Sequence, residues 1–198
     1  MPKIVDHNKR KIQIAEATWN VIIKEGIEQA TVRNIAQASG LSVGAIRYYF
    51  ASQSELLAFS MDLVSERVLE RIKIRKHIKE VNPLDVVTEG IYEVLPIDED
   101  RKIEMEVWLA FSAKVLVDTA LRERSNAVYQ DMHQGLKKAI YMLQSSNLTK
   151  DDIDIELEAN RLHALVDGMA THHLLNPEYF TRQQMMDTLN YHLQSLCK

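Results

Sequence analysis

The sequence has 198 residues, of which 46% are apolar and 26% are charged, a balance typical of a globular chain and not of a disordered or fibrous one. No apolar run approaches the roughly 18 to 20 residues of a membrane span, and the N-terminus has no apolar segment of a secretory signal. The single cysteine, Cys197, excludes an intrachain disulfide framework. These features predict a cytoplasmic protein.

The formal net charge of −4 is unevenly distributed along the chain. Residues 1–50 carry seven basic and four acidic side chains, whereas the remaining 148 carry 17 basic and 24 acidic ones. This distribution predicts a small basic head that approaches a polyanion and a larger acidic body that does not.

Nearly every segment has the 3.6-residue apolar period of a helix, so we predict an all-α fold of about nine helices. A three-helix head is expected over residues 1–52, continuing into a linking helix over 53–78, and a larger helical bundle for ligand binding and dimerisation over 79–198. The first helix is expected over 8–24, and Thr31 is expected to cap a short second one. A third helix is expected over 43–50, and a long one that is capped by Ser52 is expected to reach residue 77. The next helix begins at Asn82-Pro83 and is stopped by Pro96, and the last four are expected over 98–117, 119–144, 151–175 and 181–196.

Residues 31–50 have the spacing of a helix-turn-helix. Ala36 is small where the second helix must approach the first, and Gly40 four residues later accepts the positive φ of the turn. Ile46, six residues further on, fills the angle between the two helices, and Ile35 and Leu41 complete the small core. The alternative is a three-helix packing motif that has no DNA partner.

Ser42 is placed to cap the third helix, whose N-terminal end would enter the major groove of DNA. Arg47 is suited to guanine or to a phosphate, and Val43 and Ala45 are small enough to contact a thymine methyl group. The residues expected to contact DNA are Thr31, Arg33, Ser42, Val43, Gly44, Ala45, Arg47, Tyr48 and Tyr49.

The run from residue 30 to 50, with the paired Tyr48-Tyr49 and the following Ser-Gln-Ser-Glu-Leu-Leu, closely resembles the DNA-binding region of tetracycline-repressor-type (TetR/AcrR) regulators. The resemblance covers about residues 8 to 60. It implies a third helix in the major groove, together with a larger domain that dimerises and binds a small effector. Gln53 stands where this family commonly has a phosphate-binding lysine, which implies a neutral contact and a weaker dependence of binding on salt.

Residues 107–113, 165–170 and 175–177 resemble the ligand-binding domain of the betaine-synthesis repressor (BetI-like) branch, which does not identify the effector. Aromatic and methionine side chains at helical spacings predict an effector pocket, with Trp108 and His133 as its best candidates. The alternative is that these side chains simply fill the core. The full set is Tyr92, Met105, Trp108, Phe111, Tyr129, Met132, His133 and Met169.

Stripes on the last two predicted helices suggest a dimer interface built as a four-helix bundle. Packing within the chain is the alternative. The expected interface residues are Leu162, Val166, His173, Met185, Leu189, His192 and Leu196, with Met169 on the first stripe.

Together these features predict a ligand-responsive repressor that binds a palindromic DNA operator as a homodimer and is released by a small-molecule effector. No catalytic residue, metal or cofactor is expected. A DNA-binding protein without an inducer is one alternative. A metal-dependent enzyme is another, because His163 and Asp167 lie one helical turn apart, but no third ligand has a convincing spacing.

Overall fold

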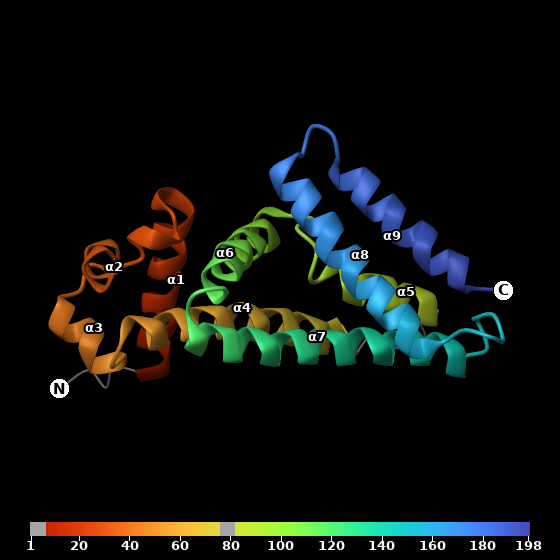
Figure 1. Ribbon diagram of the computed structural model, residues 1–198, viewed down its shortest axis with the longest axis horizontal. Coiled ribbons are helices and arrows are strands. Elements are labelled where there is room, and N and C mark those ends of the chain that lie inside the picture. The colour runs from red at the N-terminus through yellow and green to blue at the C-terminus, as the bar shows by residue number, and fades with distance from the viewer. Residues whose placement is uncertain (1–6, 76–81) are drawn as a thin grey trace. The chain divides into compact units, whose positions relative to one another are not determined.

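The computed structural model describes residues 7–75 and 82–198. Within these ranges the chain forms nine α-helices and one 3₁₀ turn, with no named β-strand, as the all-α prediction required (Figure 1). No helix in the described part is long and apolar enough to cross a membrane. The elements are α1 (His7–Glu25), η1 (Ile27–Gln29), α2 (Val32–Ser39), α3 (Val43–Tyr49), α4 (Gln53–Arg75), α5 (Pro83–Tyr92), α6 (Glu99–Val115), α7 (Thr119–Ser145), α8 (Ile155–Leu175) and α9 (Arg182–Leu196).

The chain divides into two compact units. The first comprises the residues up to Arg67 together with Glu106–Ser125, and the second comprises Val68–Met105 together with Asn126–Lys198. Helices α4, α6 and α7 therefore each contribute residues to both units. The division into 1–52, 53–78 and 79–198 concerns functional roles and stays a prediction.

In the first unit, α2 and α3 form the helix-turn-helix that the sequence predicts. The side chain of Thr31 caps α2 by accepting a hydrogen bond from the backbone N of Asn34 at 3.2 Å, and Ser42 caps α3 by accepting one from Ala45 N at 3.1 Å. Gly40 adopts the left-handed conformation at φ +67°, and Ile46 is buried between the helices. The spacing argument for this motif is confirmed.

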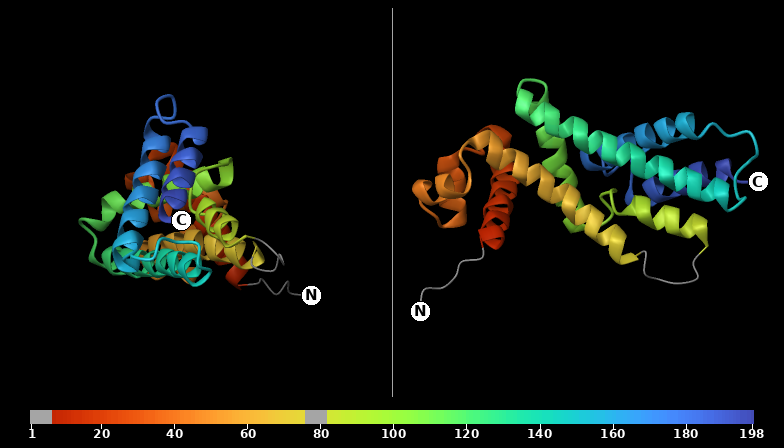
Figure 2. Two further views of the ribbon diagram at one scale, coloured as in Figure 1. Left: turned by 90° about the vertical axis from the view of Figure 1, so that its right-hand side faces the viewer. Right: turned by 90° about the horizontal axis from the view of Figure 1, so that it is seen from below.

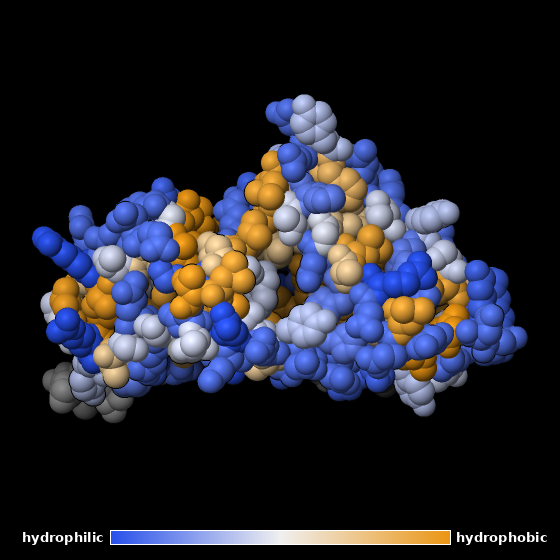
Figure 3. Space-filling model, viewed as in Figure 1, coloured by the Kyte–Doolittle hydropathy of each residue, from blue (hydrophilic) through white to orange (hydrophobic). Residues whose placement is uncertain are grey.

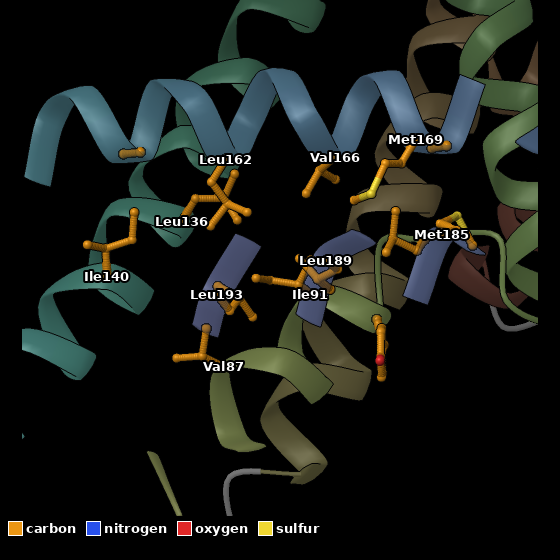
Figure 4. Packing of buried hydrophobic residues seen from close by; sticks show 14 of the residues in the cluster. Val87, Ile91, Leu136, Ile140, Leu162, Val166, Met169, Met185, Leu189 and Leu193 are labelled. Atoms are coloured by element: carbon orange, nitrogen blue, oxygen red, sulfur yellow. The ribbon is translucent and has the colours of Figure 1, made fainter. Parts of the chain in front are cut away.

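In the second unit, α8 and α9 run side by side (Figures 1 and 2). Figure 4 shows Leu162 and Val166 of α8 pointing toward Leu189 of α9, with Ile91 of α5 and Leu136 of α7 closing the cluster. Burying this apolar surface is the main stabilising contribution to the unit.

Most element boundaries lie within two residues of the sequence predictions, and larger differences occur at α8, α5 and η1. Helix α8 begins at Ile155 and not at residue 151, because Asp154 caps it by accepting hydrogen bonds from the backbone N atoms of Glu156 and Leu157 at 3.0 and 3.1 Å. Helix α5 ends at Tyr92, before Pro96, and the 3₁₀ turn η1 was not predicted. The expected end of the linking helix at residue 77 lies outside the described residues.

Candidate nucleic-acid interface and effector region

The outer side of α2 and α3 presents the side chains that the sequence assigned to DNA contact. Tyr48 is 75% exposed and Val43 is 37% exposed. The exposed members of the set are Arg33, Ser42, Val43, Gly44, Arg47 and Tyr48, and the half-buried ones are Thr31, Ala45, Tyr49 and Gln53. The surface therefore offers two guanidinium groups, a phenol and a helix N-terminus to a polyanion.

Two residues near the start of α1 support the aromatic side chains of α3 and its C-terminal cap, and sequence reasoning missed both. The ring centroid of His7 lies 4.8 Å from that of Tyr49 and 5.9 Å from that of Tyr48. The Lys11 ammonium lies 4.9 Å from the ring centroid of Phe50, a cation–π contact. No sequence signal links residues about 40 positions apart in this way.

The head is held to the first half of α4 by contacts within the first unit. Trp19 Nε1 donates a hydrogen bond to the backbone O of Ser60 at 3.1 Å. The Arg67 guanidinium lies 4.7 Å from the Trp19 ring centroid and forms an ion pair with Glu16. Because these contacts fasten α1 to α4, the three-helix head and the first half of α4 form one packed body.

The structure separates the predicted pocket residues into different environments. Trp108 and the fully buried Phe111 belong to the first unit, whereas the other six belong to the second. Four of these six are part of the apolar core, namely Tyr92, Met105, Met132 and Met169. The packing of these four side chains agrees with the alternative given above, that such residues fill the core.

Most residues of the predicted dimer stripe are buried within the chain itself, and the dimer interface stays a prediction. Leu162, Val166, Met185 and Leu189 pack inside the second unit, because the apolar faces of α8 and α9 are buried against each other and against α5 and α7. His192 and Leu196 are also buried, and His173 is half-buried with its Nδ1 2.9 Å from the Phe180 carbonyl oxygen. An apolar period shows that a face is buried, not what covers it.

The remaining two pocket candidates, Tyr129 and His133, form a ring cluster with His163 in the second unit. The ring centroids of Tyr129 and His163 are 4.6 Å apart, and those of His133 and His163 are 6.0 Å apart. The Nδ1 atoms of both imidazoles are buried without a hydrogen-bond partner. His133 Nε2 lies 3.0 Å from a carboxylate oxygen of Glu156, and His163 Nε2 lies 3.8 Å from one of Asp167.

His163 makes the stability of the protein depend on pH. Burial lowers the pKa of His163 below its usual value of 6.5; the Asp167 carboxylate opposes this shift and the His133 imidazole adds to it. The unfolded chain then binds the proton more tightly than the folded one, so we expect the free energy of unfolding to fall as the pH drops through 6.5. Below the folded pKa this loss levels off.

Urea unfolding of the wild type and of His163→Gln at several pH values measures this effect. The variant is expected to lose part of the pH dependence. His172→Gln, which replaces an exposed histidine on the same helix, is the matched control and is expected to keep it. Equal pH dependence in the wild type and His163→Gln would show that His163 does not carry the effect.

Among residues 7–75 and 82–198, no group of three or more His, Cys, Asp or Glu side chains is arranged to hold a metal ion. His163 and Asp167 lie near one another, as their spacing predicted, and His163 belongs to the ring cluster described above.

The fold and the exposed α2–α3 surface define the class of a helix-turn-helix DNA-binding protein. Residues 14–58 match the model of the tetR family of bacterial regulatory proteins, and residues 83–198 match that of the C-terminal domain of BetI-type transcriptional repressors. The chain belongs to the TetR family of transcriptional regulators and is a DNA-binding protein of the repressor type.

Relatives along the whole chain agree with this assignment. The chain is 42% identical over 197 residues to the HTH-type transcriptional regulator PksA of Bacillus subtilis, covering 100% of this chain and 94% of the relative. It is 28% identical over 202 residues to the regulator BetI of Vibrio vulnificus, covering 98% and 96% of the two chains.

Solved structures share the fold. A TetR transcription regulator from Haloarcula marismortui superposes with a TM-score of 0.84 at 19% identity, covering 96% of this chain and 100% of that one. A putative transcriptional regulator from Saccharomonospora viridis in complex with choline gives 0.83 at 22% identity, covering 93% and 95%.

Proposed function

We propose that this regulator represses transcription as a homodimer that binds a near-palindromic operator and is released by a small-molecule effector. The observation that carries the proposal is the capped helix α3, whose outer face exposes Arg47 and Tyr48 beside Arg33 of α2. In a dimer, two such helices would enter successive major grooves about 34–36 Å apart.

Direct reading of bases is assigned to a few of the exposed residues. Arg47 is suited to bidentate contact with guanine, and Val43 and Ala45 are suited to thymine methyl groups. Thr31, Tyr49 and the amides at the N-terminus of α3 are assigned to phosphates, which set the register without reading sequence.

The dimer is assigned to the outer faces of α8 and α9, since their inner faces are already buried. Leu157 and Leu175 of α8 are 56% and 64% exposed, and Tyr191 of α9 is 77% exposed. Figure 3 shows apolar residues reaching the surface among hydrophilic ones along α8. A β-carbon added at Gly168 would meet nothing within 4 Å in the chain, which leaves room for a second copy to approach. Exposed apolar side chains on paired helices favour association across a two-fold axis.

The effector is assigned to the body of the protein, and one structural neighbour is a regulator in complex with choline. Two separate candidate places combine apolar surface with polar atoms: the half-buried Trp108 on α6 in the first unit, and the Tyr129–His133–His163 ring cluster in the second unit. Helices α4, α6 and α7 each have residues in both compact units, so a shift of these helices reaches the head directly. The two DNA-binding heads of the dimer are separated by one distance when bound to the operator and by another when released. Release requires that the effector bind the released conformation more tightly than the operator-bound one.

The first experiment is a mobility-shift assay of the purified protein with DNA fragments from around its own gene, at two salt concentrations. Specific and salt-sensitive retardation of one fragment is expected. Arg47→Ala is expected to weaken operator binding by about 1–3 kcal/mol, because a bidentate base contact is lost.

Arg10→Ala, which removes a half-buried cation of α1 outside the reading helix, is the control and is expected to weaken binding to operator and random DNA alike. Unchanged operator affinity of Arg47→Ala at fixed salt contradicts the role given to Arg47. Retardation of no fragment by the wild type contradicts the proposed function.

A further inference from the structure

The first residue of α4 is bonded to the entry of the helix-turn-helix. Gln53 Nε2 donates a hydrogen bond to the backbone O of Ala30 at 2.8 Å, across 23 residues of sequence. Ala30 is fully buried and lies between η1 and Thr31, the cap of α2. A buried carbonyl needs a donor, and the side chain of Gln53 supplies it.

Further hydrogen bonds hold the chain at both ends of this bond. On the α4 side, Ser52 accepts a hydrogen bond from the backbone N of Glu55 at 3.0 Å, and the Glu55 carboxylate accepts one from Ala51 N at 2.7 Å, which fixes the start of the helix. The Gln53 side chain therefore projects from a backbone that these hydrogen bonds already hold in place.

On the other side, the turn that contains Ala30 is fastened to α2. Asn34 Nδ2 donates to the backbone O of Gln29 at 2.9 Å, while the backbone N of Asn34 donates to the Thr31 cap. Glu28 of η1 also forms an ion pair with Lys114 of α6 at 3.2 Å, within the same compact unit. A displacement of the Ala30 carbonyl thus moves α2, and α3 follows through the packed Ile46.

The bond uses one of the donors that a phosphate contact by Gln53 would need. Gln53 is half-buried, and its side-chain amide donates to the Ala30 carbonyl. A contact to phosphate carries no sequence information, whereas the orientation of α2 and α3 decides whether Arg47 and Val43 meet their bases.

We infer that Gln53 is a positioning residue for sequence recognition, which holds the reading helices at a fixed orientation to α4. This inference rests on the proposed binding of an operator. Loss of the bond lets α2 and α3 turn relative to α4, so base contacts weaken while phosphate contacts, which tolerate small shifts, persist. The ratio of operator affinity to random-DNA affinity then falls.

The test is Gln53→Met in the full chain, since methionine matches the shape of glutamine and cannot donate the bond. Dissociation constants are measured for the operator and for a random duplex of equal length at two salt concentrations. Operator affinity is expected to fall about ten-fold, whereas random-DNA affinity changes less than two-fold and the salt dependence stays the same. Gln13→Met, at an exposed position on α1, is the matched control and is expected to change neither affinity.

Hydrogen exchange of the α2 and α3 amides gives a readout that does not depend on DNA. Faster exchange is expected there in Gln53→Met, and the loss of the donor to the buried Ala30 carbonyl is expected to lower the thermal midpoint of the whole chain by only a few degrees. Equal losses on operator and random duplex would overturn the inference in favour of a phosphate contact, and so would unchanged affinities together with unchanged exchange. If the wild type binds the operator and the random duplex equally well, the proposed function is overturned. The exchange measurement still tests the effect of the Gln53–Ala30 hydrogen bond in that case.

Discussion

Replacing Arg71 with methionine is expected to lower the free energy of unfolding by about 3–5 kcal/mol, because the change leaves a buried carboxylate unpaired. Arg71, in the second half of α4, donates to both carboxylate oxygens of Glu104, at 2.9 and 2.7 Å, and to a carboxylate oxygen of Glu93 at 2.8 Å. The Glu93 and Glu104 side chains are 1% and 6% exposed. Arg101 also binds Glu93, at 2.9 Å, so Glu104 loses most when Arg71 is removed.

The hydrogen bonds and charge of Glu104 raise the pKa of Arg71, partly offset by the cost of burial, so the Arg71 guanidinium is charged at neutral pH. Urea unfolding at pH 7 and at one fixed protein concentration measures the loss.

Arg67→Met is the matched control for this prediction. Arg67 lies one turn earlier on α4 and also forms an ion pair, but its side chain and that of Glu16 are 35% and 45% exposed. Solvent weakens such a pair, so its loss, together with the loss of the Arg67–Trp19 cation–π contact, is expected to cost about 1–2 kcal/mol. Equal losses in the two variants would contradict the burial argument. The double variant Arg71→Met, Glu104→Met removes both charges and is expected to recover much of the stability.

The helix-turn-helix could be predicted from sequence because its determinants are local. Thr31, Ala36, Gly40, Ser42 and Ile46 lie within 16 residues, and each has one backbone or packing requirement that few residue types satisfy. Caps and a positive φ are read from a single window of sequence, and the structure confirms each of them.

The support around that motif could not be predicted, because its partners are distant in sequence and chemically ordinary. Gln53 and Ala30 are 23 residues apart, and Arg71 bonds residues 22 and 33 positions away. Periodicity likewise identified Leu162 and Leu189 as buried but assigned them to a partner chain, when α5 and α7 of the same chain cover them. The hydrophobic pattern of a helix does not show whether its apolar face is covered by the same chain or by a partner chain.

Replacing Phe111 with alanine is expected to cost about 3–5 kcal/mol of unfolding free energy, since a fully buried aromatic ring is removed and a cavity remains. The sequence placed Phe111 with Trp108 in the effector pocket, yet burial distinguishes them: Phe111 is 0% exposed and Trp108 is half-buried. Urea unfolding measures the loss, and Phe111→Leu, which refills most of the volume, is expected to restore more than half of it.

Leu116→Ala is the control for this prediction, because that side chain, just after the last residue of α6, is 74% exposed and its truncation is expected to change stability by less than about 0.5 kcal/mol. If Phe111→Ala keeps wild-type stability, the ring does not hold the first unit together and the pocket interpretation of Phe111 gains support. If it destabilises as expected, any change in effector response of this variant follows from weakened packing of α6. A test of the effector site is then better directed at Trp108 and the Tyr129–His133–His163 cluster.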